Sequence, residues 1–212
     1  MNGKIVTGLF SLFVIKLLEI NADNICIRMI KLRWRWYFMA TLRQQDSLVM
    51  ANFVIDLSIQ EENLITNLQL QKILFFLQGY SLQKYSKPIL ADNFSKWQYG
   101  PVIEKVYQEF KSNGSEKISD KAVEIVDDCS FFNIKEYGPL VSDDLGGKKN
   151  FEDIECFVKN LIMIDPWELV KMTHDHLSWK NYEPRIINHE YLQYTNAEIR
   201  DCFNHNKERL PV

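Results

Sequence analysis

Hydrophobic residues recur at intervals of three and four over most of the chain, the spacing expected for amphipathic helices. The first clear stretch, residues 49–57, has an apolar face made of Val49, Phe53, Val54 and Leu57. The polar sequence at 61–63 then interrupts the pattern. The next stretch, LQLQKILFFLQGYSLQKY at 68–85, is apolar on two opposite faces, which is typical of a helix buried between neighbours. We therefore predict a central helix here, with Thr66 or Asn67 as its N-cap.

Two large aromatic residues, Trp97 and Tyr99, come directly before Gly100 and Pro101. Proline is favoured at the first position of a helix because its missing N–H costs nothing there, and glycine allows a turn before it. Since residues 102–110 then repeat apolar positions at three and four, we interpret Gly100-Pro101 as the start of a helix. Trp97 and Tyr99 alternate across the extended approach to it, where each either fills the core or faces outward.

The second half of the chain predicts further helices. Helical periodicity resumes in residues 151–164, and Asp165 followed by Pro166 predicts the cap and the first position of another helix. A last amphipathic helix is expected at about 196–209, whereas residues 122–126 fit either a short strand or a short helix. The predicted fold class is therefore mainly α: a compact helical domain with at most a few short strands.

Three polar residues interrupt the apolar faces of the predicted central helix. Gln71 and Gln78 lie seven residues apart on a seam between the two apolar faces, and Lys72 lies on another seam. Buried amides generally form hydrogen bonds, so we expect the two glutamines to hold the backbone of a neighbouring loop. Contact with a partner is the alternative.

Charge divides the chain near residue 46. Residues 1–46 contain seven Lys and Arg against three Asp and Glu, a net charge of +4, whereas residues 47–212 contain 18 against 25, a net charge of −7. We accordingly predict an N-terminal extension, 1–46, and a helical domain, 47–212. An acidic domain repels a phosphate backbone and favours a basic partner surface, so we do not expect nucleic acid to be its partner.

The extension contains two notable segments. Residues 5–15 are uncharged and apolar, but eleven residues span only about 17 Å as a helix, so no membrane crossing is expected. No convincing cleavage site for a signal peptide follows, and we expect a cytoplasmic protein. Residues 33–37, RWRWY, interleave basic and aromatic side chains. The extension is either poorly packed or upstream sequence joined to the true start, for which Met39 and Met50 are candidates.

Few residues carry the signature of a catalytic or metal site. The four cysteines are far apart and form no C-x-x-C pair, which argues against a zinc cluster or a disulfide framework: Cys26, Cys129, Cys156 and Cys202. His174 and His176 could contribute to a metal site, but no third ligand stands at a readable spacing. A histidine at the end of a helix more often interacts with the terminal carbonyl groups. We therefore predict no catalytic residue, no metal and no cofactor.

Several motifs together resemble those of the Panacea (SocA-like) antitoxin domain family, which includes phage-associated and GepA-like proteins. In the first half these are ANFVID (51–56), ITNLQLQKILFFLQGYSL (65–82), KPIL (87–90), F-x-x-W-x-Y-G-P-V (94–102) and V-Y-x-E-F-K (106–111). The second half adds ELVKMTH (168–174) and Ser178-Trp179-Lys180. Ser178 departs from the family pattern, in which proline commonly precedes the tryptophan. The resemblance covers about 48–205 and does not extend to the first 46 residues.

The resemblance implies a mostly helical, non-enzymatic antitoxin of a toxin–antitoxin or prophage system. Such a protein neutralises a cognate toxin, encoded nearby, by direct protein binding. The family does not specify which toxin, and the sequence does not specify the oligomeric state. Our candidate partner-binding residues surround the Gly-Pro junction, and each alternatively completes the core: Lys72, Trp97, Tyr99, His174 and Trp179.

Two other functions compete with this interpretation. The first is a DNA-binding autoregulator of the protein's own operon, although the acidic domain lacks a basic recognition helix. The second, with less support, is a metal-dependent enzyme that uses His174 and His176.

Overall fold

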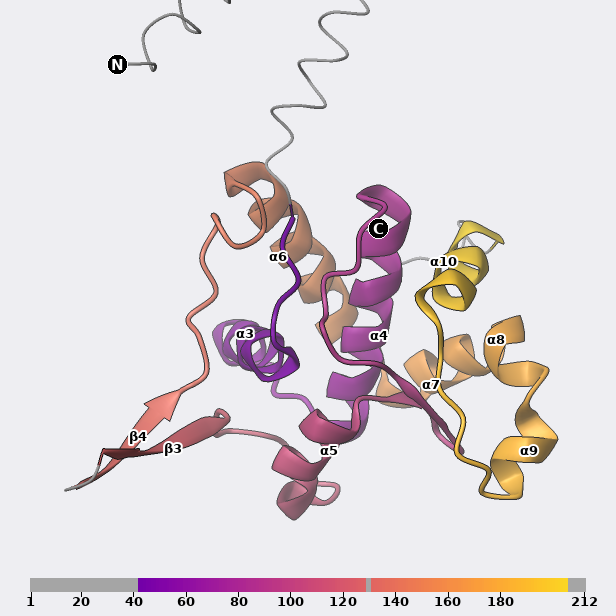
Figure 1. The fold of residues 1–212 in the computed structure, drawn as a ribbon, viewed down its shortest axis with the longest axis horizontal. Helices are drawn as coiled ribbons and strands as arrows, with labels where there is room; N and C mark the ends of the chain where they lie inside the picture. Colours follow the sequence, from indigo (N-terminus) through magenta and orange to yellow (C-terminus); the bar gives the residue numbers. More distant parts are fainter. Residues whose placement is uncertain (1–41, 129–130, 206–212) are drawn as a thin grey trace, which may run out of the picture. The chain divides into compact units, whose positions relative to one another are not determined.

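The computed structural model describes residues 42–128 and 131–205 (Figure 1). The segments at 5–15 and 33–37 lie outside these residues, as does the end of the last predicted helix beyond 205. In chain order the elements are α3 (Ser47–Gln60), α4 (Asn67–Lys84), β1 (Ser95–Trp97), β2 (Gly100–Val102), α5 (Glu104–Phe110), the 3₁₀ helix η1 (Lys111–Asn113), β3 (Val123–Asp128), β4 (Phe131–Glu136), α6 (Lys148–Ile162), α7 (Pro166–His174), α8 (Leu177–Lys180), α9 (Glu183–Ile187) and α10 (Asn196–His205). The fold is mainly α, as predicted.

Helix α4 is the centre of the fold. It contacts α3 and α6 on one side and α7 and α10 on the other (Figure 1). The predicted cap is confirmed, because the Thr66 side chain accepts a hydrogen bond from the backbone N–H of Gln69. Helix α10 approaches so closely at Gly79 that a Cβ there would lie 2.2 Å from the Phe203 ring. The two apolar faces seen in the sequence are thus both covered by other helices, and α4 is buried along most of its length.

Two buried glutamines of α4 hold loops in place. The Gln71 Oε1 atom accepts a hydrogen bond from the backbone N–H of Ile103 at 2.9 Å. The Gln78 Oε1 atom accepts from the backbone N–H groups of Ile89 and Leu90, each at 3.0 Å. Each amide therefore satisfies backbone donors that burial would otherwise leave without a partner.

Helix α3 and the residues before it also belong to the core. Asp46 caps α3 by accepting a hydrogen bond from the backbone N–H of Leu48. Gln45 pairs with Leu90 in an isolated parallel bridge, and the Leu42 side chain is buried in the hydrophobic core. Leu42, Gln45 and Asp46 therefore pack with the helical domain, although the sequence-based prediction assigns them to the extension.

The interpretation of Gly100-Pro101 as a helix start is wrong. Both residues lie in strand β2, which pairs antiparallel with β1 and places Trp97 opposite Gly100. Helix α5 begins only at Glu104. The physical reason is the positive φ of Gly100, +92°, which forms the hairpin turn rather than a helical entry. The prediction missed the hairpin because Gly-Pro is compatible with either structure.

Of residues 122–126, which fitted either a strand or a helix, 123–126 lie in strand β3. Strands β3 and β4 form an antiparallel hairpin that extends away from the helices (Figure 1). Its base is fixed by the buried Asn52 of α3, whose amide nitrogen donates to the carbonyl oxygens of Ala122 and Tyr137. The Asn52 oxygen also accepts from the backbone N–H of Ala122. One buried side chain therefore holds both ends of the hairpin.

The helices predicted in the second half are confirmed. Asp165 caps α7 through the backbone N–H groups of Trp167 and Glu168, with Pro166 at its first position. Thr195 and Glu198 form reciprocal hydrogen bonds at the start of α10, which is a capping box. Over 42–128 and 131–205, the structure contains no helix with the length and hydrophobicity to cross a bilayer.

Candidate functional site

A pocket of about 590 Å³ lies beside the β1–β2 hairpin. It is bounded by the N-terminal half of α4, the hairpin, α5 and the segment at 186–192. Its walls are largely apolar and aromatic, and include Leu68, Trp97, Tyr99, Val102, Tyr107 and Leu192. Three of the five predicted binding residues line it: Lys72, Trp97 and Tyr99. A concave surface of this size and character is typical of a binding site.

Lys72 extends from α4 toward the hairpin and is fully buried. Its Nζ atom donates a hydrogen bond to the carbonyl oxygen of Pro101 at 3.0 Å. Burial lowers the pKa of Lys72 to about 7, and no ion pair among the described residues includes it. A Cβ added to Gly100 would lie 3.1 Å from Nζ and 2.6 Å from Thr173 Oγ1, so a glycine is needed where the hairpin crosses the lysine.

His174 and Trp179 support the hairpin from behind the pocket. The two rings stack with centroids 3.8 Å apart, and the Trp179 indole N–H donates to the carbonyl oxygen of Trp97 at 3.0 Å. Burial lowers the pKa of His174, and the nearby charge of Lys72 lowers it further. These two residues therefore do not line the pocket, but they hold the strand that carries Trp97.

The two aromatic residues of the hairpin have different environments. Trp97 is partly buried and packs edge-to-face against Tyr107, with centroids 4.9 Å apart. Tyr99, in the turn, is 55% exposed and lies 6.0 Å from the ring of Trp167, which is 60% exposed. Sequence reasoning missed Trp167. The sequence held no clear signal for it, because the first turn of α7 contains both the exposed Trp167 and the buried Leu169.

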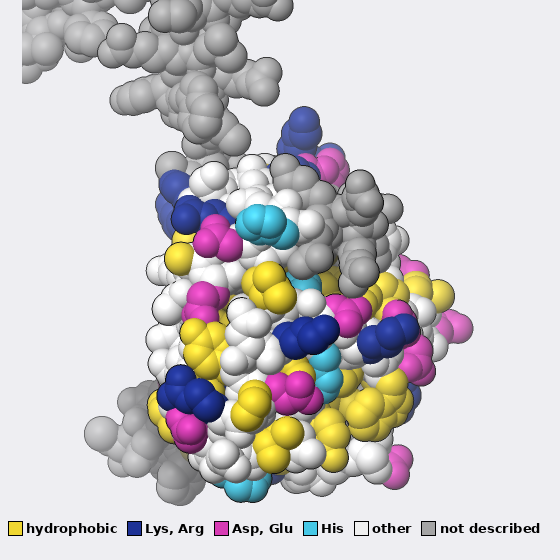
Figure 2. All heavy atoms as spheres, turned by 90° about the vertical axis from the view of Figure 1, so that its right-hand side faces the viewer, with side chains coloured by type: hydrophobic (Ala, Val, Ile, Leu, Met, Phe, Trp, Pro, Cys, Tyr) yellow, Lys and Arg dark blue, Asp and Glu magenta, His cyan; other side chains and the backbone are white. Residues whose placement is uncertain are grey.

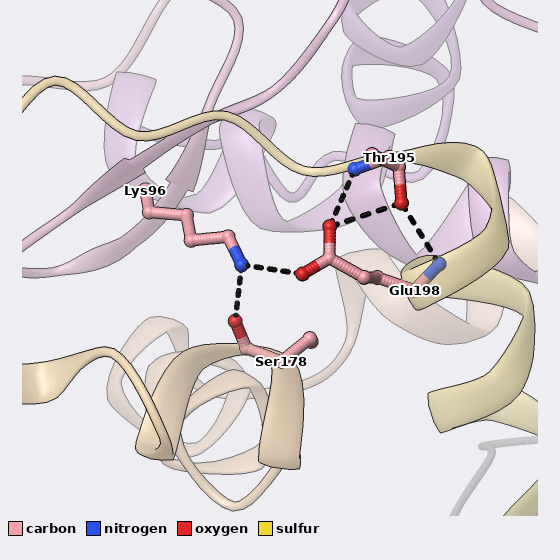
Figure 3. A network of polar contacts seen from close by, with 4 residues as sticks. All are labelled: Lys96, Ser178, Thr195 and Glu198. Carbon is pink, nitrogen blue, oxygen red and sulfur yellow. Dashed lines mark hydrogen bonds and ion pairs between the residues drawn. The ribbon is translucent and has the colours of Figure 1, made fainter.

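Lys96 of β1 is the second buried lysine of the pocket wall, and it too was missed. Its Nζ atom pairs with Glu198 at 2.9 Å and donates to the carbonyl oxygen of Ser178 at 2.8 Å (Figure 3). The ammonium also lies 3.6 Å from the centroid of the Tyr182 ring, a cation–π contact. This network joins the hairpin to α8 and α10, elements that lie about 80 to 100 residues later in the chain.

The departure from the family pattern at Ser178 falls within this network. Ser178 contributes its backbone carbonyl, which any residue could supply, so the proline commonly found there is not needed for the contact with Lys96.

The two histidines of the metal hypothesis lie in different surroundings. His174 stacks on Trp179, whereas His176 lies against the rings of Phe75 and Phe203. Over the part of the chain that the structure describes, no group of three His, Cys, Asp or Glu side chains converges on a point where a metal could bind.

The face of the molecule formed by the C-terminal helices carries a mixed surface. Figure 2 shows hydrophobic side chains interspersed with both positive and negative groups on this face. It is not the continuous basic surface that proteins use to bind a nucleic-acid backbone.

Comparisons with known proteins identify the family. A family model described as "Antitoxin SocA-like, Panacea domain" matches residues 70–180, which run from the first turn of α4 through the hairpin to the end of α8. The chain is also similar to the protein named Antitoxin SocA of Caulobacter vibrioides (strain NA1000 / CB15N), with 35% identity over 78 residues. That match covers 37% of this chain and 42% of the relative, so the chain matches less than half of the relative's length. No solved structure is significantly similar. The matched region contains Gln71 and Lys72 of the pocket wall together with the hairpin, and the chain belongs to the SocA-like antitoxin family with a Panacea domain.

Proposed function

We propose that this protein is an antitoxin that binds a cognate toxin protein directly and thereby neutralises it, without catalysing a reaction. Membership of the SocA-like antitoxin family is the observation that carries this proposal. We further propose that the toxin is encoded by a neighbouring gene and that the two proteins meet in the cytoplasm.

The surface we propose for toxin binding is the pocket together with Tyr99 and Trp167 at its edge. Tryptophan and tyrosine contribute disproportionately to binding energy at protein interfaces, because they bury a large area at a small entropic cost. Tyr99 and Trp167 are both more than half exposed and touch each other. The pocket beside them can receive an anchoring side chain from the partner.

Co-expression with the product of the neighbouring gene tests the proposal. We expect growth to stop when that gene is expressed alone and to recover when this protein is present. The paired substitution Tyr99→Ala and Trp167→Ala removes the exposed aromatic pair and should abolish recovery. Ile134→Ala is the matched control, because Ile134 is 73% exposed on the distant β3–β4 hairpin.

Two outcomes would contradict the proposal. Continued toxicity in the presence of the wild-type protein would exclude neutralisation of that toxin. Full recovery with the double variant, in a protein shown by circular dichroism to be folded, would exclude the aromatic pair as the binding surface.

A further inference from the structure

Two buried lysines line the same pocket, and within residues 42–128 and 131–205 only one of them has a counter-ion. Lys96 is paired with Glu198 and also contacts the Tyr182 ring. Lys72 has a single hydrogen bond, to the carbonyl oxygen of Pro101, and no carboxylate partner among the described residues. Burying an ammonium group without a counter-ion is strongly unfavourable. A lysine buried at a pocket wall without a counter-ion therefore lowers the stability of the fold, and a ligand that supplies a negative charge there would remove this cost.

The other charged groups of the pocket do not supply a counter-ion. The lining also includes Lys111, a further positive charge. The one acidic residue in the lining is Glu190, which lies 2.7 Å from Arg185 and is already paired. The pocket is thus locally positive, although residues 47–212 carry a net charge of −7. A group that fits this pocket should carry a negative charge, which complements the lysines, and an apolar part, which packs on the walls.

We propose that this pocket receives an acidic segment of the toxin, whose carboxylate becomes the counter-ion of Lys72 while a neighbouring apolar side chain packs on the aromatic walls. This inference rests on the proposed antitoxin function and specifies the chemistry of its partner. A carboxylate suits Lys72 because its negative charge offsets the cost of burying the ammonium, which the neutral carbonyl of Pro101 does not.

Access to Lys72 is controlled by the hairpin turn. The ammonium is fully buried against Gly100 and Pro101, so these two residues of the hairpin must shift for a carboxylate to reach it. A Cβ at Gly100 would lie 3.1 Å from the ammonium, so only a glycine lets the hairpin backbone lie this close to Lys72. The same turn carries the exposed Tyr99, so a partner that binds Tyr99 is placed to move it.

A pair of small probes tests the chemistry directly. Indole-3-acetate carries an aromatic body and a carboxylate, and indole-3-acetamide has the same shape without the charge. Titration of the full chain, followed by nuclear magnetic resonance, should show the acetate binding at least tenfold more tightly than the amide. Lys72→Met should remove this preference. Lys84→Met, a change to a lysine outside the pocket, should retain it.

Several results would overturn the inference. Equal affinity for the two probes, no binding of either at millimolar concentration, or an unchanged preference in Lys72→Met would each exclude Lys72 as an anion site. If the acetate binds but Lys72→Met and Lys72→Gln still neutralise the toxin fully, the pocket accepts acids yet the toxin does not use it. Failure of the wild-type protein to neutralise contradicts the proposed function instead, which keeps the two failures distinguishable.

Discussion

Replacing Lys72 by methionine should stabilise the protein near neutral pH. The ammonium is fully buried, and burial lowers its pKa from 10.5 to about 7. At about 1.4 kcal/mol for each tenfold change in the protonation equilibrium, this shift corresponds to about 5 kcal/mol of lost stability. Methionine fills a similar volume without a charge but loses the hydrogen bond to Pro101, which we take as about 2 kcal/mol. We therefore expect Lys72→Met to raise the free energy of unfolding by about 2 to 3 kcal/mol at pH 7.

The sign of the pH dependence follows from the lowered pKa. Between pH 7 and 10.5 the unfolded chain keeps the Lys72 proton while the folded protein releases it, so wild-type stability rises with pH. The cost of burying the lysine is fully present below about pH 7 and is gone above about pH 10.5. Lys72→Met lacks this contribution. The difference in stability between Lys72→Met and the wild type should therefore shrink by about 3 kcal/mol between pH 7 and pH 9.5, and it should be close to zero at pH 9.5.

Urea unfolding of both proteins at pH 7 and pH 9.5 measures these differences. Lys84→Met is the control, because Lys84 is paired with Asp153 and its pKa is raised despite partial burial. The effect of Lys84→Met on the free energy of unfolding should hardly change between pH 7 and pH 9.5. A Lys72→Met protein less stable than wild type at pH 7, or one with an unchanged difference at pH 9.5, would refute the argument that the buried ammonium is destabilising.

Three further substitutions test other contacts. Asn52→Ala removes three hydrogen bonds at the base of the β3–β4 hairpin and should lower the free energy of unfolding, measured with urea, by about 2 to 4 kcal/mol. A decrease below about 0.5 kcal/mol would contradict the role assigned to this amide. Glu198→Gln leaves the buried ammonium of Lys96 without its carboxylate and should lower the free energy of unfolding by about 3 kcal/mol. Breaking the more exposed ion pair between Lys84 and Asp153 should lower it by less than about 1 kcal/mol. Gly100→Ala places a Cβ 2.6 Å from a neighbouring oxygen at a positive φ, and we expect the melting temperature to fall by several degrees; an unchanged value would show that the hairpin relaxes freely.

The helical part of the fold could be predicted because its signals are local. The period of the apolar residues predicted α3, α4, α6 and α7, and side chains one to three residues from each helix start supplied the caps, as at Thr66 and Asp165. The burial of α4 on both sides also followed from its sequence, since apolar residues occupy two faces. The combination of motifs around α4 and the hairpin was sufficient to identify the family.

The site depends on contacts between distant parts of the chain. Gly100-Pro101 is locally compatible with a helix start or a strand. In the folded protein these residues form a strand, β2, which pairs with β1. Strand β1 is in turn bridged to Gln193 on its other edge. Lys72 and Lys96 are equally charged in the sequence. Only the tertiary structure gives one of them a carboxylate, from a helix 102 residues away, and leaves the other without one. The physical reason is that helical periodicity and capping act within a few residues, whereas desolvation and charge pairing depend on which segments pack together.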